Sequence, residues 1–146
     1  MFFNRIYFRI FPMKSYFLKI AVLFIVPVSI SLAAATCNIA SIKGRYAYLV
    51  YGTQRPAESF NAVGTTIFDG NGHFTSSGSS VLNDVPSEYT SAGDYLVFKD
   101  CSVRINETLS DTGSNLQFGV LANGGKKIFA VSREPGKNFS LIYEKQ

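Results

Sequence analysis

The sequence predicts an all-β protein, a small antiparallel eight-stranded meander β-barrel. Short segments rich in β-branched and aromatic residues recur at intervals of about 8 to 14 residues, which is the strand spacing of barrels and sandwiches. Turn sequences separate these segments, and the clearest is Asp69-Gly70-Asn71-Gly72. After residue 36, no segment keeps the apolar period of a helix.

Residues 1–35 are expected to be a secretory signal peptide, followed by one β-barrel domain at 36–146. The segment has only basic charges, then an apolar run from Ile20 to Ile30, then Ala33-Ala34-Ala35. This order is typical of an export signal, and the run is shorter than the roughly 20 residues of a membrane span. Met13 is an alternative start, and an uncleaved anchor is the alternative to cleavage. The basic residues are Arg5, Arg9, Lys14 and Lys19.

The charge excess of the chain belongs to this leader. The whole chain has 14 basic and 10 acidic residues, and removing the four leader residues leaves ten of each. A net charge near zero gives no reason to expect a nucleic-acid partner. We also expect an exported monomer, periplasmic or secreted, with no stable membrane insertion after cleavage of the predicted leader.

Cys37 and Cys101 are the only cysteines. In an exported protein two cysteines most simply form a disulfide, which here closes a loop of about 64 residues and contributes ~4 kcal/mol in the chain-entropy model. Lipid modification of Cys37 is the alternative. The preceding residues lack the Leu at −3 and the Gly or Ala at −1 that are usual in bacterial lipoprotein signals.

Each predicted strand has its own signature. The first is aromatic and bounded by glycines, the second and fifth alternate cleanly, and the third is mostly Ser, Thr and Gly, so that it should bury little. Gly93 in the fourth indicates a bulge or bend. Before the first strand, Ile39 and Ile42 could form a helical turn that plugs one end. The predicted strands are Gly44–Gly52, Phe60–Phe68, His73–Leu82, Tyr89–Phe98, Cys101–Leu109, Asn115–Leu121, Lys126–Ser132 and Asn138–Glu144.

The connections are all short, so sequential strands should be antiparallel neighbours. Eight such strands can close into a barrel and remove their edges. A β-sandwich is the alternative, but Greek-key sandwiches need longer crossovers. An eight-stranded barrel is either filled by side chains or holds one small ligand.

Several glycine-rich motifs resemble those of a group of small exported bacterial proteins. The shared pattern is a Gly-x-Tyr strand at Gly44–Tyr46, the AVG-x-x-x-FDG-x-G hairpin at 62–72, and the step Asp100-Cys101. The sequence departs from this pattern at 89–95. The resemblance implies a lipocalin-like or allene oxide cyclase-like barrel in outline and implies no activity, because its motifs specify turns rather than chemistry.

Glu107 and a set of tyrosines are the candidate ligand-binding residues. Glu107 shares a strand face with Val103 and Ile105, so an inward face would carry its carboxylate inside, where it could act as an acid or bind a polar ligand group. The alternative is a position at a wet rim. Tyr46 and Tyr48 share one face of the first strand and could grip an apolar ligand, although ordinary core packing explains them too. The remaining tyrosines considered are Tyr51, on the opposite face, Tyr95 and Tyr143.

No metal, cofactor or catalytic motif is expected. His73 is the single histidine, and with Asp69 and Asn71 it falls short of the ligand sets of calcium or zinc sites. Three functions therefore stay open. The first is a barrel that binds a small, largely apolar ligand without chemistry. The others are an isomerase or cyclase that uses Glu107 with tyrosines, and a secreted interaction module with a filled barrel.

We predict that the leader is removed near Ala35, because the small-residue site there follows the apolar run. Intact-mass measurement of exported protein should give the mass of a chain that begins close to residue 36. A species that keeps Met1 or Met13, or that carries acyl chains on Cys37, would contradict this prediction.

Overall fold

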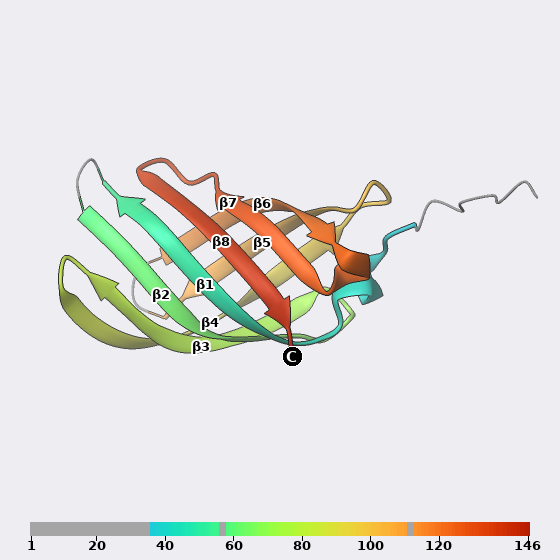
Figure 1. Ribbon diagram of the computed structural model, residues 1–146, viewed down its shortest axis with the longest axis horizontal. Coiled ribbons are helices and arrows are strands. Elements are labelled where there is room, and N and C mark those ends of the chain that lie inside the picture. The colour runs from blue at the N-terminus through green and yellow to red at the C-terminus, as the bar shows by residue number, and fades with distance from the viewer. Residues whose placement is uncertain (1–35, 56–57, 111–112) are drawn as a thin grey trace, which may run out of the picture. The chain divides into compact units, whose positions relative to one another are not determined.

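The computed structural model describes residues 36–55, 58–110 and 113–146, and the predicted barrel is confirmed. Eight antiparallel strands follow one another in chain order, and β8 pairs with β1 to close the barrel (Figure 1). The predicted signal peptide lies outside the described residues, among which no helix is long and apolar enough to cross a membrane. The strands are β1 (Gly44–Gln54), β2 (Glu58–Phe68), β3 (His73–Leu82), β4 (Val85–Val97), β5 (Ser102–Leu109), β6 (Gly113–Ala122), β7 (Lys127–Ser132) and β8 (Lys137–Lys145).

Because the barrel is closed, one face of every strand points to the interior and the other to solvent. On β1, Tyr46, Tyr48 and Val50 are buried, whereas Leu49 and Tyr51 are exposed. The same alternation continues in the other strands, because each register is unbroken around the barrel. One continuous sheet therefore encloses one interior, and the sandwich alternative does not apply.

The start of β4 differs from the prediction. The connection before it has only two residues, Asn83 and Asp84, whose φ angles of 47° and 65° are those of a type I′ hairpin turn. The strand thus resumes at Val85, and Pro86 lies within it, opposite Val81. Pairing with β5 begins only at Ser91. Proline is tolerated here because, within the described ranges, this first part of β4 is paired on one side only.

Gly93 is a point of close approach and not a bulge. It pairs with Phe74 on β3 and Glu107 on β5 without a break in either register. A Cβ atom at this position would lie 2.0 Å from the carbonyl oxygen of Asn106. The strand needs glycine because two backbones approach each other here.

A plug fills one end of the barrel, as the apolar lead-in predicted. It consists of two 3-10 turns, η1 (Ile39–Ile42) and η2 (Asn123–Gly125), which lie at the same end in Figure 1. Ile42 is completely buried. The Tyr46 hydroxyl donates to the Gly125 carbonyl, and the Tyr95 hydroxyl donates to the Ile39 carbonyl at 3.2 Å. Phe68 packs at the centre of this end, with ring contacts to Tyr46, Phe74, Tyr95 and Tyr143.

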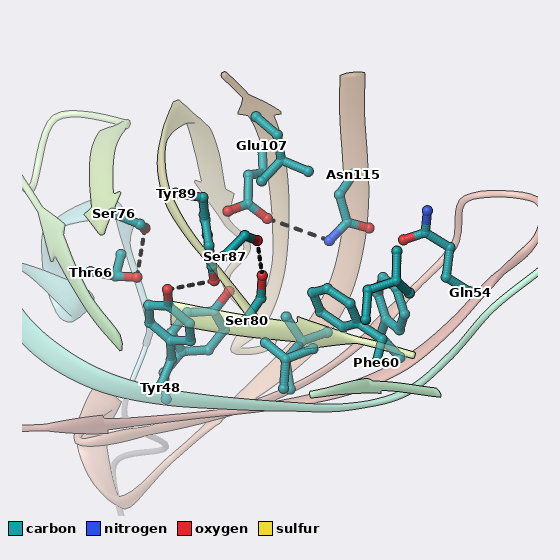
Figure 2. Close-up of a pocket in the computed structure, with 16 residues that line it drawn as sticks. Tyr48, Gln54, Phe60, Thr66, Ser76, Ser80, Ser87, Tyr89, Glu107 and Asn115 are labelled. Carbon is teal, nitrogen blue, oxygen red and sulfur yellow. Dashed lines mark hydrogen bonds between the residues drawn. The ribbon is translucent and has the colours of Figure 1, made fainter. Parts of the chain in front are cut away.

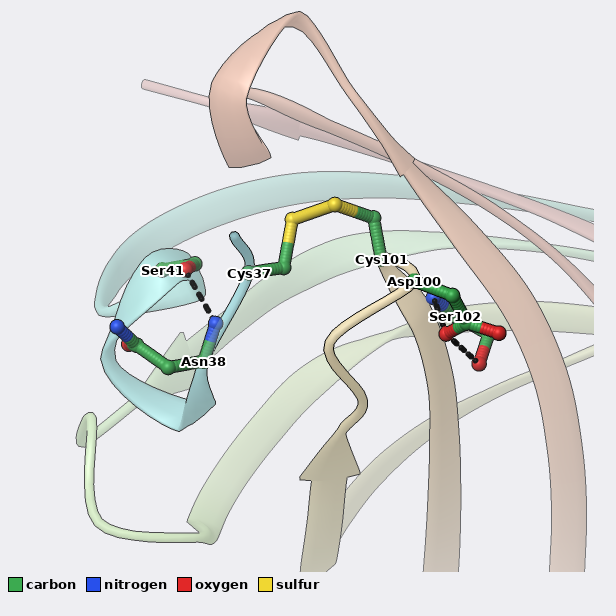
Figure 3. Close-up of a disulfide and its surroundings, with 6 residues drawn as sticks. All are labelled: Cys37, Asn38, Ser41, Asp100, Cys101 and Ser102. Atoms are coloured by element: carbon green, nitrogen blue, oxygen red, sulfur yellow. Dashed lines mark hydrogen bonds between the residues drawn. A yellow bond between two sulfur atoms is a disulfide. The ribbon is translucent and has the colours of Figure 1, made fainter. Parts of the chain in front are cut away.

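The predicted disulfide joins Cys37 to Cys101 and anchors this plug. It links the segment before η1 to the turn between β4 and β5 (Figure 3). Asn38 caps η1, since its side-chain oxygen accepts from the backbone N–H of Ala40 at 3.0 Å. On the other side, Asp100 accepts from the backbone N–H of Ser102 at 3.0 Å. Both anchor segments are therefore locally ordered, and the bond fixes the plug to the barrel wall.

The opposite half of the barrel is lined more thinly, because two glycines face each other on its inner surface. Gly64 of β2 pairs with Gly78 of β3, and Tyr48 pairs with Gly64 from β1. A Cβ atom would lie 2.4 Å from the Tyr48 hydroxyl oxygen at Gly64 and 2.2 Å from it at Gly78. The tyrosine side chain thus occupies the space above the glycine pair.

Replacing Gly78 with Val should destabilise the protein by about 1–3 kcal/mol, because the added atoms overlap the Tyr48 side chain and the carbonyl of Val63. Ser79→Val is the matched control, since residue 79 is the next position on β3 and points to the other face. It should change the free energy of unfolding by less than about 0.5 kcal/mol. Urea unfolding followed by circular dichroism measures both values, and equal losses would contradict the steric explanation.

Candidate functional site

The half of the barrel away from the plug contains a cavity of about 120 Å³. Its lining reaches the strand ends opposite the plug, at Gln54, Leu82 and Leu109, and every strand except β7 contributes to it. Figure 2 shows its side chains. The lining residues are Tyr48, Val50, Gln54, Phe60, Thr66, Ser76, Ser80, Leu82, Ser87, Tyr89, Glu107, Leu109, Asn115, Phe139, Leu141 and Tyr143.

One wall of the cavity is apolar. Phe60 of β2 stacks on Phe139 of β8 with ring centroids 4.7 Å apart. Val50 and Leu141, which pair across β1 and β8, continue this wall. Such a surface favours the apolar part of a ligand, because contact with it removes apolar area from water.

Hydroxyl groups line the neighbouring wall. Thr66 and Ser76 are hydrogen-bonded at 2.7 Å across β2 and β3, and Ser80 and Ser87 at 3.0 Å across β3 and β4. These small residues leave space where larger ones would fill the barrel. Strand β3 was predicted to bury little, but its inward serines are buried and form this polar surface.

A pair of tyrosines crosses the cavity beside these hydroxyls. Tyr48 of β1 and Tyr89 of β4 have the glycine pair of β2 and β3 between them, and their hydroxyl oxygens are 2.5 Å apart (Figure 2). One hydroxyl donates to the other. The second proton of the pair is thus left to donate elsewhere, for example to a ligand.

Glu107 accepts three hydrogen bonds, from two neighbouring strands. Ser91 of β4 donates to Oε1 at 2.6 Å. Gln117 and Asn115, both of β6, donate to Oε2 at 3.0 Å and 3.4 Å. All three partners are donors, which is the arrangement that suits an ionised carboxylate.

Two further hydrogen bonds fix the direction of this network. The Tyr143 hydroxyl donates to Oε1 of Gln117 at 2.8 Å, and the Ser132 hydroxyl donates to Oδ1 of Asn115 at 2.7 Å. Each amide therefore accepts with its oxygen and directs its NH₂ group toward Glu107. Gln117 is completely buried, and no buried side-chain polar atom among the described residues lacks a partner.

The phenols of the cavity stay protonated over a wide pH range. Burial, with a contribution from the negative charge of Glu107, raises the pKa of Tyr48 to about 12. Burial also raises the pKa of Tyr89 and of Tyr143, and Glu107 acts in the same direction on both. Near neutral pH these residues are hydrogen-bonding phenols and not phenolates.

The sequence-derived candidates divide between the two ends of the barrel. Tyr48 and Glu107 line the cavity, as does Tyr143. Tyr46 does not, because it is buried in the plugged half and its hydroxyl is bonded to Gly125. Tyr95 lies in the same half, and the exposed Tyr51 is on the outer face.

Several cavity residues were not among the candidates. Tyr89 was placed at the first position of its predicted strand, so its inward direction was not recognised. Asn115 and Gln117 alternate with apolar residues on β6 and resemble outward polar positions in the sequence. The available signal was Glu107 itself, because a carboxylate that faces the barrel interior needs hydrogen-bond donors on neighbouring strands.

The loop at 69–72 is held by hydrogen bonds between the Asp69 carboxylate and the backbone. Asp69 accepts from the backbone N–H groups of Asn71 at 2.7 Å and His73 at 3.0 Å, and these bonds lower its pKa. Gly70 and Gly72, which have positive φ, are buried beside the plug, so the loop is wider and less exposed than a two-residue hairpin tip. In the part of the chain that the structure describes, no three His, Cys, Asp or Glu residues group as metal ligands.

Comparison with known proteins identifies no family. No protein-family model and no curated protein matches the chain. Among solved structures, it is similar to a redesigned β-barrel, mFAP0, bound to DFHBI. That similarity has a TM-score of 0.48 and 12% identity, and it covers 72% of this chain and 99% of that chain.

The raised pKa of Tyr48 predicts a loss of stability in alkali. The unfolded chain releases the phenol proton near pH 10, whereas the folded protein retains it to about pH 12. The melting temperature should therefore stay constant up to about pH 10 and fall as the pH rises toward about 12. Tyr48→Phe should show a shallower fall in circular-dichroism melts, because it removes one of these groups. An unchanged slope would contradict the prediction.

Proposed function

We propose that this protein is an exported binding protein that holds one small molecule in the open half of its barrel. The observation that carries the proposal is the cavity of about 120 Å³, closed by the plug at one end and extending to the strand ends at the other. Small-molecule sites are typically concave and largely preformed, with apolar walls and a few convergent polar groups. This cavity has all of these properties.

The lining favours an amphipathic ligand over a largely apolar one. Phe60, Phe139 and Leu141 belong to the apolar wall, and the same cavity is lined by the polar groups of Glu107 and of the Tyr48–Tyr89 pair. An entirely apolar molecule would leave the carboxylate and the hydroxyls without new partners and would displace their water. We therefore expect an apolar body with a polar head group.

Export is supported by the disulfide. Structural disulfides form and persist in oxidising compartments and are rare in the cytosol. The bond here ties the beginning of the described chain to residue 101. This is compatible with a protein that folds after it leaves the cytoplasm, in the periplasm or outside the cell.

The other two functions receive less support. An interaction module with a filled barrel does not account for the cavity or for the polar groups inside it. An isomerase or cyclase would use Glu107 with tyrosines, but the carboxylate already accepts three donors, and the phenol of Tyr48 has a pKa of about 12. This arrangement is suited to recognition rather than to proton transfer near neutral pH.

The size of the cavity suggests a first probe. An apolar cavity of roughly 150 Å³ holds benzene in another protein, so 120 Å³ with an open end suits a single-ring compound. Benzyl alcohol has such a ring and one polar group. Ligand-detected NMR should show that it binds the wild-type protein.

Ser80→Phe should weaken this binding at least about tenfold, because the buried Ser80 lines the cavity and a phenyl ring there would occupy the space. Ser79→Phe is the control, with the same change on the outer face of the same strand. It should bind benzyl alcohol like the wild type. Undiminished binding by Ser80→Phe, or a wild type that binds neither benzyl alcohol nor a charged compound with the same ring, would contradict the proposed function.

A further inference from the structure

The cavity contains one charge and nothing that neutralises it. Among the described lining residues, Glu107 is the single charged side chain, and none of them is Lys, Arg or His. No described basic residue forms an ion pair with it. Three neutral donors stabilise the carboxylate, but its negative charge remains, and its field contributes to the raised pKa values of Tyr48, Tyr89 and Tyr143.

The hydrogen bonds of Glu107 leave one acceptor position open. A carboxylate has about four lone-pair directions. Oε2 accepts from Gln117 and Asn115, whereas Oε1 accepts only from Ser91. In Figure 2 the carboxylate points into the cavity that also contains the tyrosine hydroxyls. A donor on a ligand can therefore reach Oε1 without displacing a protein partner.

We propose that the ligand of this cavity is a small organic cation, a primary or secondary ammonium group on a compact apolar body. The proposal rests on the proposed function and names its ligand class. The ammonium group donates to Oε1 of Glu107, and the apolar body packs against the Phe60–Phe139 wall. A body of about one ring fits the 120 Å³ available.

Part of the desolvation free energy that such a site requires is already offset in the folded protein. Burying an ion pair is unfavourable when both ions must leave water. Here three protein donors already replace part of the water around the carboxylate, so most of the desolvation on binding falls on the ammonium group. Hydroxyl oxygens of Tyr89 and Ser87 line the same cavity and can accept its other protons, and the aromatic faces of the tyrosines also attract cations.

The other charge classes fit less well. An anion would meet the carboxylate with no cation in the lining to offset the repulsion. A neutral alcohol can donate to Oε1, but its hydrogen bond is weaker than that of an ammonium group, since a bond between two charged partners is the stronger kind. A preference for the cation is therefore the distinguishing property of the site.

Benzylamine, benzyl alcohol and benzoate test this preference, because they share one ring and differ in charge at neutral pH. Their dissociation constants for the wild-type protein can be measured by ligand-detected NMR at low ionic strength. Benzylamine should bind at least about tenfold more tightly than benzyl alcohol, and benzoate should be the weakest. Glu107→Gln should remove the advantage of benzylamine over benzyl alcohol, because the amide is neutral and presents an NH₂ group where Oε1 accepted.

Glu107→Gln is expected to fold, since its amide oxygen can still accept from Gln117 and Asn115 while its NH₂ group donates to the Ser91 hydroxyl. Its melting temperature and circular-dichroism spectrum verify this. Glu88→Gln is the matched control, because it removes one exposed negative charge from β4 outside the cavity and should keep the benzylamine preference.

Each outcome supports or contradicts the assignment of a cationic ligand. Equal binding of benzylamine and benzyl alcohol, or a preference that survives Glu107→Gln, would overturn the cation assignment and leave the proposed binding function standing. A preference that is lost equally in Glu88→Gln would overturn it too, because the effect would then be general electrostatics. If none of the three compounds binds the wild type, both proposals fail.

Discussion

The pairing of β8 with β1 is the interaction on which the other features depend. It runs from Tyr46 opposite Lys145 to Gln54 opposite Lys137, and it converts a meander with two open edges into a closed barrel. Once the sheet is closed, the side-chain alternation of every strand becomes a choice between interior and exterior, and a shift by one residue would exchange the two faces. The inward positions of the Glu107 network and of the tyrosine pair follow from this single constraint.

Within the closed barrel, residue size divides the interior into two halves with different roles. The plugged half contains Phe68 and the aromatic rings around it, covered by Ile42 and fixed by the disulfide. In the other half, Gly64, Gly78 and small hydroxyl residues make room, and the polar groups bond to one another. The first half contains the largest fully buried side chains, Tyr46, Tyr95, Phe68 and Ile42, whereas the second is hollow and partly polar. Proteins commonly carry such locally unfavourable features at functional sites.

The sequence predicted the architecture well because strands and turns are local signals. The alternation of β1 and β5, the plug at Ile39–Ile42 and the cysteine pair all appear in the structure as expected. The predictions were wrong where residues on other strands determine the local structure. Pro86 lies within a strand because β5 is not yet paired there, and Gly93 is required by the backbone of Asn106. Tyr46 and Tyr48 lie on the same face of β1. They differ in position along the barrel axis, so that Tyr46 lies in the plugged core and Tyr48 lines the cavity. The register of β5 against β4 and β6 decides which residues donate to Glu107, and the sequence of β5 alone does not specify that register.

The free edge at the start of β4 has a consequence for how the site opens. Among the described residues, Val85 to Tyr89 pair with β3 alone, and the strand begins at the tight turn Asn83–Asp84. Backbone held on one side opens locally at a lower free energy than backbone held on both, and its amide protons exchange sooner. Tyr89 lies in this segment, which pairs on one side. Its partner Tyr48 lies on β1, which pairs with a strand on each side. Local opening of this hairpin would separate the two hydroxyl groups and widen this end of the barrel, and it would need no movement of the other strands.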